Sequence, residues 1–361
     1  MATTKVLDLT GRARKLQVTV ESGPSFEFLV SLCAFGLPND RETMEVGPAW
    51  FDKIRRLASP ELLAAWDRTG LMAGKAWVNF VGLATATPAA RDVPALLARI
   101  QSLSALDVRL YLLGYHVPAY QGKISRDLLR QAALGDPAAQ DSLLTDSSYF
   151  GGEADPALRP LLALGVDETK AVALDVLHRW SDEVFARLEP GVAGALDRDA
   201  AATRKLAESA EPERLIELAS GMQFVLNPAI RQVFLIPQVA MRPWVLLCEH
   251  DDARLFCYPV ADESLGAAAA DPPGRLVRLH KALGDQKRLR MLKAIATSTA
   301  TLQELADLLG LPKSTAHHHL AILRAAGLVR VTSDLERRYS LRTDVIPEAS
   351  SLLDAYLGGT P

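Results

Sequence analysis

One stretch of the chain, residues 301–329, constrains the fold more than any other. Thr301 and Glu304 have the spacing of a capping box, and the leucines that precede Gly310 repeat at helical spacing. Gly310 stands where a left-handed residue commonly ends a helix. A second helix is expected at residues 312–326, because proline is tolerated at the first helical position. The stretch therefore predicts two helices joined by a tight turn.

The second of these helices has one apolar face and one polar face. Ala316, Leu320 and Leu323 form the apolar stripe. The opposite face carries only polar side chains, namely Lys313, Ser314, His317, His318 and Arg324. A helix-turn-helix places a polar second helix of this kind in the major groove of DNA.

The chain on either side of this motif predicts a winged domain. Residues 328–333 and 337–342 alternate apolar and polar side chains as half-buried strands do, and residues 334–336 can turn between them. The resulting wing carries Arg330, Arg337, Arg338 and Arg342. Helices are expected at residues 276–283, from Asp285 onward, and at residues 345–356. This order describes a winged helix-turn-helix.

Several segments, in this order, resemble the ArsR/SmtB family of bacterial repressors. They are Leu283–Leu292, Glu304–Ala306, Ser314–Leu320 and Ala326–Val329. The resemblance spans residues 275–357 and implies a homodimeric DNA-binding repressor whose first and last helices form the dimer contact. Two departures are His317, where the family usually has Ser, and a wing tip without the common Gly-Arg pair. The residues predicted to contact an operator in double-stranded DNA are Lys313, Ser314, Thr315, His317, His318, Arg324, Arg330, Arg337 and Arg338.

The metal ligands of the sensors in that family are missing from this domain. Thr301 and Gln303 occupy the positions of a Cys-x-Cys pair, and residues 344–357 contain no histidine. Soft metals and zinc require thiolate or imidazole ligands. The run His317–His319 does not replace them, because consecutive helical side chains point about 100° apart. We therefore expect no metal site and no response to zinc, arsenite or chelators.

Charge is divided unevenly along the chain. The net charge is −3 over 361 residues, but residues 275–361 carry 13 Lys and Arg against 8 Asp and Glu. A basic C-terminal segment that follows an acidic N-terminal segment indicates a DNA-binding domain attached to a domain that DNA repels. The expected organisation is a large, mostly helical domain at residues 1–262, a linker at 263–274 and the winged domain at 275–361.

The fold class is therefore expected to be mainly α, with only minor β structure in the first domain. Residues 15–21 alternate as a strand does, and residues 244–249 and 254–258 predict a β-hairpin around Asp251 and Asp252. The three cysteines are Cys33, Cys248 and Cys257, and their apolar surroundings indicate buried free thiols.

The first domain contains no motif that indicates catalysis. A phosphate-binding glycine fingerprint, Gly-x-Ser-x-Gly and HExxH are all missing from the sequence. No catalytic residue, cofactor or enzymatic activity is therefore predicted. The aromatic residues Trp77, Tyr111, Tyr115 and Tyr120 are candidates for binding a small apolar or aromatic effector, with ordinary core packing as the alternative.

Taken together, these features predict a cytoplasmic transcriptional regulator, acting as a homodimeric repressor on double-stranded DNA. No apolar run approaches the 18 residues of a membrane span, and no signal peptide is expected. Two alternatives are an enzyme whose winged domain regulates its own gene, and an assembly module whose winged domain binds protein.

Overall fold

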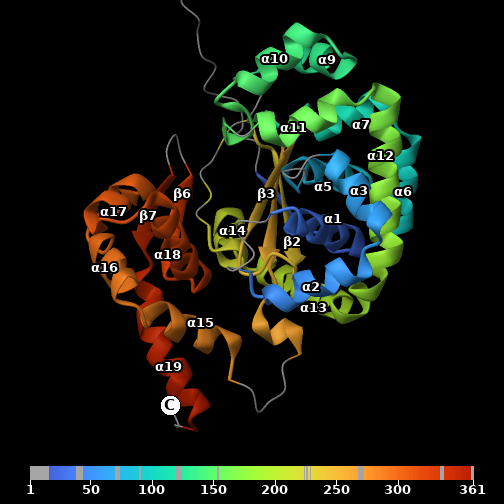
Figure 1. Cartoon of the computed structure of the whole chain (residues 1–361). Helices are drawn as coiled ribbons and strands as arrows, with labels where there is room; N and C mark the ends of the chain where they lie inside the picture. Colours follow the sequence, from blue (N-terminus) through green and yellow to red (C-terminus); the bar gives the residue numbers. More distant parts are fainter. Residues whose placement is uncertain are drawn as a thin grey trace, which may run out of the picture.

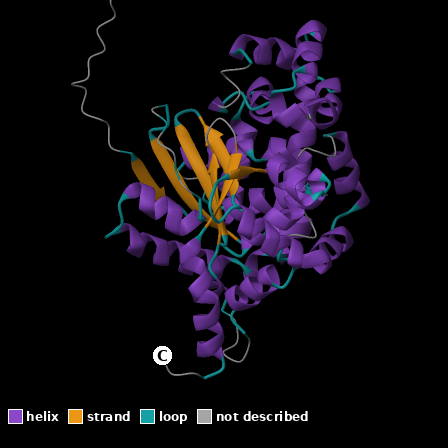
Figure 2. Ribbon diagram, turned by 90° about the vertical axis from the view of Figure 1, so that its left-hand side faces the viewer, coloured by secondary structure: helices purple, strands orange, loops and turns teal. Residues whose placement is uncertain are grey.

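The computed structural model, shown in Figure 1, describes residues 16–37, 44–69, 74–88, 91–118, 124–152, 154–222, 224, 227, 229–266, 272–333 and 337–358. Helix is the predominant secondary structure (Figure 2). The mainly α fold expected from the sequence is confirmed. None of the helices in these ranges is both long enough and apolar enough to span a lipid bilayer.

The N-terminal part of the chain is a layered helical assembly. Its helices are α1 (Pro24–Phe35), α2 (Gly47–Leu57), α3 (Pro60–Arg68), α4 (Gly74–Trp77), α5 (Asn79–Ala86), α6 (Val93–Ser102), α7 (Ala105–Leu112), α9 (Arg126–Leu134), α10 (Pro137–Thr145), α11 (Ala154–Ala163), α12 (Val166–Arg179), α13 (Ala193–Ala207) and α14 (Pro212–Ser220). Many of these helices begin at a side-chain cap, as between α6 and α7, where the Ser104 hydroxyl accepts the Asp107 N–H at 3.0 Å. Short polar caps thus divide the periodic sequence into many helices.

A four-stranded sheet lies among these helices (Figure 1). Its strands are β1 (Gln17–Val20), β2 (Gln232–Gln238), β3 (Leu246–His250) and β4 (Ala253–Pro259), in the spatial order β1-β2-β4-β3. The predicted hairpin is confirmed, because β3 and β4 are antiparallel around Asp251, whose φ is 50°. The sequence analysis did not anticipate β2, which is parallel to both β1 and β4. A parallel strand covered on both faces lacks the alternation that marks a half-buried strand.

Two hydrophobic clusters hold the N-terminal part together. The larger one is rich in aromatic side chains, and Trp66 lies 6.1 Å from Trp180 and 6.3 Å from Trp77 between ring centroids. The smaller one joins α14 to the outer face of the sheet through Ile216, Val233 and other buried residues. The three cysteines are buried and free, as predicted.

The C-terminal part builds the expected winged helix-turn-helix. Its elements are α15 (Gly274–Leu283), α16 (Gln286–Ala294), β5 (Ala300–Thr301), α17 (Leu302–Leu309), α18 (Lys313–Ala325), β6 (Val329–Ser333), β7 (Arg337–Leu341) and α19 (Ile346–Tyr356). β6 and β7 are antiparallel, and β5 adds a third strand beside β7. A separate hydrophobic cluster, formed entirely by residues from Leu279 onward, fills this domain. The predicted turn at 334–336 and residues 267–271 of the predicted linker lie outside the described residues.

Candidate DNA-binding interface

The turn between α17 and α18 is fixed by local hydrogen bonds. The Thr301 hydroxyl accepts the Glu304 N–H at 3.2 Å, and the Glu304 carboxylate accepts the Thr301 N–H at 2.7 Å. This reciprocal pair is the capping box that the sequence predicts. Gly310 ends α17 with a φ of 63°, a left-handed conformation that glycine adopts without strain. The chain is thereby redirected so that α18 begins at Lys313.

The two faces of α18 are separated as the sequence predicts. Ala316, Leu320 and Leu323 are buried in the domain core. Lys313 and His317 are exposed, and Thr315 and His318 are half-buried. The described side chains on the outer face of α18 are therefore mostly hydrogen-bond donors, the groups that read base edges and phosphates.

The third histidine of the run differs from its neighbours. His319 is buried, and its Nδ1 lies 4.0 Å from the Asp285 carboxylate at the start of α16. Burial lowers the pKa of His319 below its ordinary value, although the nearby Asp285 carboxylate opposes this shift. His319 thus packs inside the domain, which leaves His317 and His318 on the outer face.

Two arginines of the wing, Arg330 and Arg338, form contacts within the protein. Arg338 donates to the Thr299 hydroxyl at 3.0 Å and lies 3.4 Å from the Glu304 carboxylate, so it braces the start of α17. Arg330 forms an ion pair with Glu217 of α14. The side chains of Arg337 and Ser314 lie outside the described residues.

α18 lies on the side of the winged domain that is next to the N-terminal domain (Figure 1), and side chains of its outer face contact that domain. The His317 ring is parallel to the Trp244 indole, with planes 4° apart and centroids 6.5 Å apart. The Arg324 guanidinium lies over the same indole at 5.6 Å, and it donates to the Met222 sulfur at 3.8 Å. Three of the residues predicted to contact DNA, His317, Arg324 and Arg330, therefore contact residues of the other domain.

The residues predicted to bind an effector are part of the packed core. Trp77 is fully buried, with its ring 6.2 Å from the Phe80 ring. Tyr111 stacks on Phe80 at 5.6 Å, and Tyr115 is only partly buried. Tyr120 lies outside the described residues. The described members of the set form a continuous aromatic layer.

A cavity of about 230 Å³ lies elsewhere in the N-terminal domain. Its wall includes Glu27 and Ser31 of α1, Trp50 and Lys53 of α2, and Val239 beyond the end of β2. Trp77, Tyr111 and Tyr115, the described residues of the predicted effector set, do not line this cavity. Its wall combines apolar and charged side chains.

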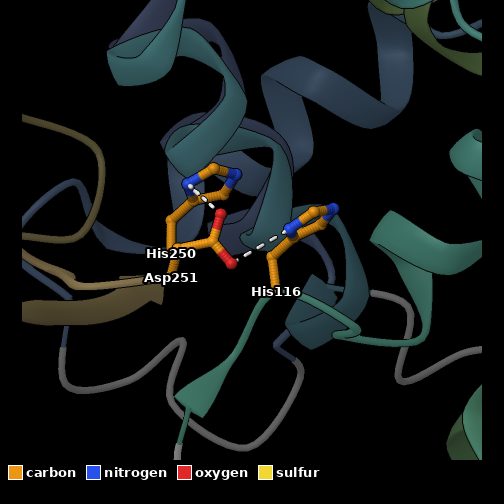
Figure 3. A group of neighbouring side chains, drawn as sticks. All are labelled: His116, His250 and Asp251. Carbon is orange, nitrogen blue, oxygen red and sulfur yellow. Dashed lines mark hydrogen bonds and ion pairs between the residues drawn. The ribbon is translucent and has the colours of Figure 1, made fainter. Parts of the chain in front are cut away.

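One group of side chains escaped the sequence analysis. His116, which follows α7, meets His250 and Asp251 at the tip of the β3–β4 hairpin (Figure 3). The sequence analysis predicted no metal site. His116 is more than a hundred positions away from His250 and Asp251 in the sequence, so no short motif links the three residues. The two adjacent residues His250 and Asp251 were the only local signal that pointed to this group.

The tight turn, the outward polar face of α18 and the β6–β7 wing define a winged helix-turn-helix, a class of domain that binds the DNA major groove. Residues 285–331 match the family described as "Bacterial regulatory protein, arsR family". The resemblance drawn from the sequence is thereby confirmed for this domain, which is that of a DNA-binding transcriptional regulator.

A solved structure is similar to about a quarter of the chain. The crystal structure of NolR from Sinorhizobium fredii shares 26% sequence identity and covers 24% of this chain and 88% of its own, with a TM-score of 0.20. No curated protein matches the chain significantly.

Proposed function

We propose that the protein is a dimeric repressor that binds a palindromic operator and releases it when an effector binds the N-terminal domain. The observation that carries this proposal is the polar outer face of α18, presented by a helix-turn-helix of the arsR type. A recognition helix with exposed Lys313 and His317 supplies donors for phosphates and base edges. We place this activity in the cytoplasm and assign no catalytic step to the protein.

Exposed apolar side chains on the first and last helices support a dimer. Val277 of α15 is 48% exposed, Tyr356 of α19 is 44% exposed, and Leu357 next to it is 72% exposed. The two helices pack on each other and are joined by an Arg275–Glu348 ion pair. Two-fold pairing of this surface would cover these side chains. The α18 helices of the two protomers would then enter successive major grooves, at half-sites about 34–36 Å apart.

The effector is proposed to act from the N-terminal domain. The winged domain has neither the thiolate pair nor the terminal histidines of metal sensors, so we propose that it does not sense metals itself. An effector must bind the DNA-competent and DNA-incompetent states with different affinities, because equal affinity shifts no equilibrium. Tyr111 and Tyr115, or the cavity beside Trp50, are the candidate sites.

The experiment is a binding measurement on a DNA duplex selected from a random library with the full-length chain. His318→Ala is expected to cost about 1–3 kcal/mol at the preferred site and to relax its specificity. Lys313→Ala is expected to weaken all duplexes alike and to lower the salt slope by about one unit. Lys205→Ala removes the same charge from α13 and serves as the control. If both α18 variants bound like the parent, the proposed interface would be wrong.

A further inference from the structure

We propose that His116, His250 and Asp251 form a binding site for a divalent transition-metal ion such as Zn²⁺, in the N-terminal domain. One ligand atom of each residue lies within 4.8 Å of the others. His116 Nδ1 lies 3.3 Å from one Asp251 carboxylate oxygen, and His250 Nδ1 lies 3.8 Å from the other. Figure 3 shows the carboxylate between the two imidazoles, with a ring nitrogen of each directed at it.

These separations suit the ligand set of zinc. Tetrahedral zinc with bonds of about 2.0–2.2 Å places neighbouring ligand atoms about 3.3 Å apart. The His116–Asp251 pair already has this spacing, and the His250–Asp251 distance exceeds it by about 0.5 Å. Two imidazoles and one carboxylate, with a fourth position open to water, are a ligand set that zinc uses in proteins. The site is distinct from the metal centres whose ligands are missing from the winged domain.

The surroundings orient the ligands before any metal arrives. His250 Nε2 lies 3.2 Å from the Tyr111 hydroxyl, so a proton on Nε2 leaves Nδ1 free to bind the metal. The Asp251 N–H donates to the His116 carbonyl at 2.8 Å, which ties the hairpin tip to the loop after α7. Gly82 of α5 packs against the His250 ring, and a Cβ there would lie 2.4 Å from the His250 Cβ. These contacts fix the His250 ring and join the backbones of His116 and Asp251.

One cation opposes the metal. The Arg126 guanidinium lies 3.3 Å from the same Asp251 oxygen that faces His116. A bound dication would be repelled by this charge and would compete with it for the carboxylate. The parent protein should therefore bind the metal less tightly than a variant in which Arg126 is neutral.

The test is titration of the full-length chain with Co²⁺, followed by the visible absorption of four- or five-coordinate Co²⁺ and by displacement with Zn²⁺. All proteins carry His317→Ala and His318→Ala, so that the exposed histidines of α18 do not contribute. We expect one equivalent to bind, and at least tenfold weaker binding in His116→Ala and in Asp251→Asn. His178→Ala, which removes an exposed histidine of α12, should bind as the background protein does.

Arg126→Gln is expected to tighten binding severalfold, a gain that an unfolded variant cannot produce. Zn²⁺ should also raise the unfolding temperature of the parent and not that of His116→Ala, because a metal that binds only the folded state stabilises it. The proposal is overturned if Co²⁺ gives no such spectrum, or if His116→Ala and Asp251→Asn bind it like the parent.

A second inference comes from the contacts between the two domains, and it rests on the proposed DNA-binding function. We infer that the N-terminal domain holds the winged domain in a closed arrangement that excludes DNA. The Trp244 ring lies beside His317 and under the Arg324 guanidinium, and Glu217 pairs with Arg330. A protein that meets DNA through these side chains has to release them first.

A further set of ion pairs joins the winged domain to the N-terminal domain. These ion pairs lie on α15 and not on the predicted DNA-binding face. Arg278 of α15 donates to both oxygens of Asp262 at 2.9 and 2.8 Å, and it lies 3.2 Å from Glu45. None of these residues belongs to the predicted DNA-contacting set. The contacts at Trp244 and Glu217 can therefore open while α15 stays attached beside the linker.

The apparent DNA affinity equals the intrinsic affinity multiplied by the fraction of molecules that are in the open arrangement. Glu217→Gln removes one partly exposed ion pair and should strengthen DNA binding about two- to fivefold. Trp244→Ala removes both ring contacts and should strengthen it further, by up to about tenfold. Trp244→Phe should behave more like the parent. Glu213→Gln removes the same charge from the same helix and is the matched control.

Two readouts separate this inference from the proposed function. Small-angle X-ray scattering of the full-length variants without DNA should show a larger radius of gyration for Trp244→Ala than for the parent. Binding to the selected duplex then reports function. Unchanged scattering together with unchanged affinity in both variants would overturn the closed arrangement. An opened variant that still binds no duplex would refute the DNA-binding proposal instead.

Discussion

Glu27 offers a sharp test of how the N-terminal domain is held together. This carboxyl group of α1 is only 3% exposed, and its two oxygens accept the N–H groups of Val239 at 3.0 Å and Ala240 at 2.8 Å. It therefore fastens the end of β2 to α1 at the wall of the cavity. Burial raises the pKa of Glu27 from 4.5 to about 7, because removal from water disfavours the charged form more than the two hydrogen bonds favour it.

The sign of the effect on stability follows from this direction. The folded state keeps the proton on Glu27 over a pH range in which the unfolded chain has lost it. The contribution of Glu27 to stability is therefore complete below pH 4.5 and is lost as the pH rises through 7. A shift of this size corresponds to a loss of about 2.5 kcal/mol between pH 5 and pH 8, at about 1.4 kcal/mol per unit.

The measurement compares the parent with Glu27→Gln, which stays neutral at every pH. Other groups titrate alike in both proteins, so the difference in unfolding free energy isolates Glu27. All five tryptophans lie in the N-terminal part of the chain, namely Trp50, Trp66, Trp77, Trp180 and Trp244. Their fluorescence during urea unfolding thus reports mainly this domain, and Trp244 also senses its contacts with His317 and Arg324 of the winged domain.

The parent should lose about 2–3 kcal/mol relative to Glu27→Gln between pH 5 and pH 8. Glu61→Gln, which neutralises an exposed carboxylate of α3, should show no such trend. If the stability of the parent relative to Glu27→Gln stayed constant between pH 5 and pH 8, or rose, the reasoning would be refuted. Such a result would mean that the Val239 and Ala240 N–H groups keep the carboxylate charged in the folded state.

Two further predictions concern positions at which local geometry is tight. Thr301→Ala removes the hydroxyl that caps α17 and should destabilise the winged domain by about 1 kcal/mol, measured as faster amide hydrogen exchange in α17; unchanged exchange would contradict this role. Gly82→Ala forces a Cβ to within 2.4 Å of the His250 side chain, and should cost the N-terminal domain about 1–3 kcal/mol in tryptophan-detected unfolding. A variant as stable as the parent would show that His250 moves aside freely.

The winged domain was largely predictable because its signals are local. The Thr301–Glu304 capping box, the left-handed Gly310 and the alternation of residues 337–341 each depend on neighbours a few positions away. The structure reproduces all three. Such signals depend little on the rest of the fold, because they satisfy backbone groups at the ends of helices through residues close by in the sequence.

The N-terminal domain was less predictable because its architecture depends on distant pairings. β2 pairs with β1 across more than two hundred residues, and no turn motif records that neighbour. Pro237 also argued against a central strand. The His116–His250–Asp251 group arises in the same way, since only the approach of the hairpin to α7 brings its members together. Metal motifs with short spacing are visible in a sequence, and this one is not.

The contacts that the N-terminal domain makes with α18 and the wing use the chemistry that DNA would offer. Glu217 presents an anionic oxygen to Arg330, as a phosphate would. The Trp244 indole presents an aromatic face to His317 and Arg324, as an exposed base would. The donors that suit α18 for DNA also make it a good partner for an acidic, aromatic surface of its own chain. A ligand that loosens this surface would favour the operator-bound state, and one that tightens it would favour release, so the sign of regulation depends on which arrangement the effector prefers.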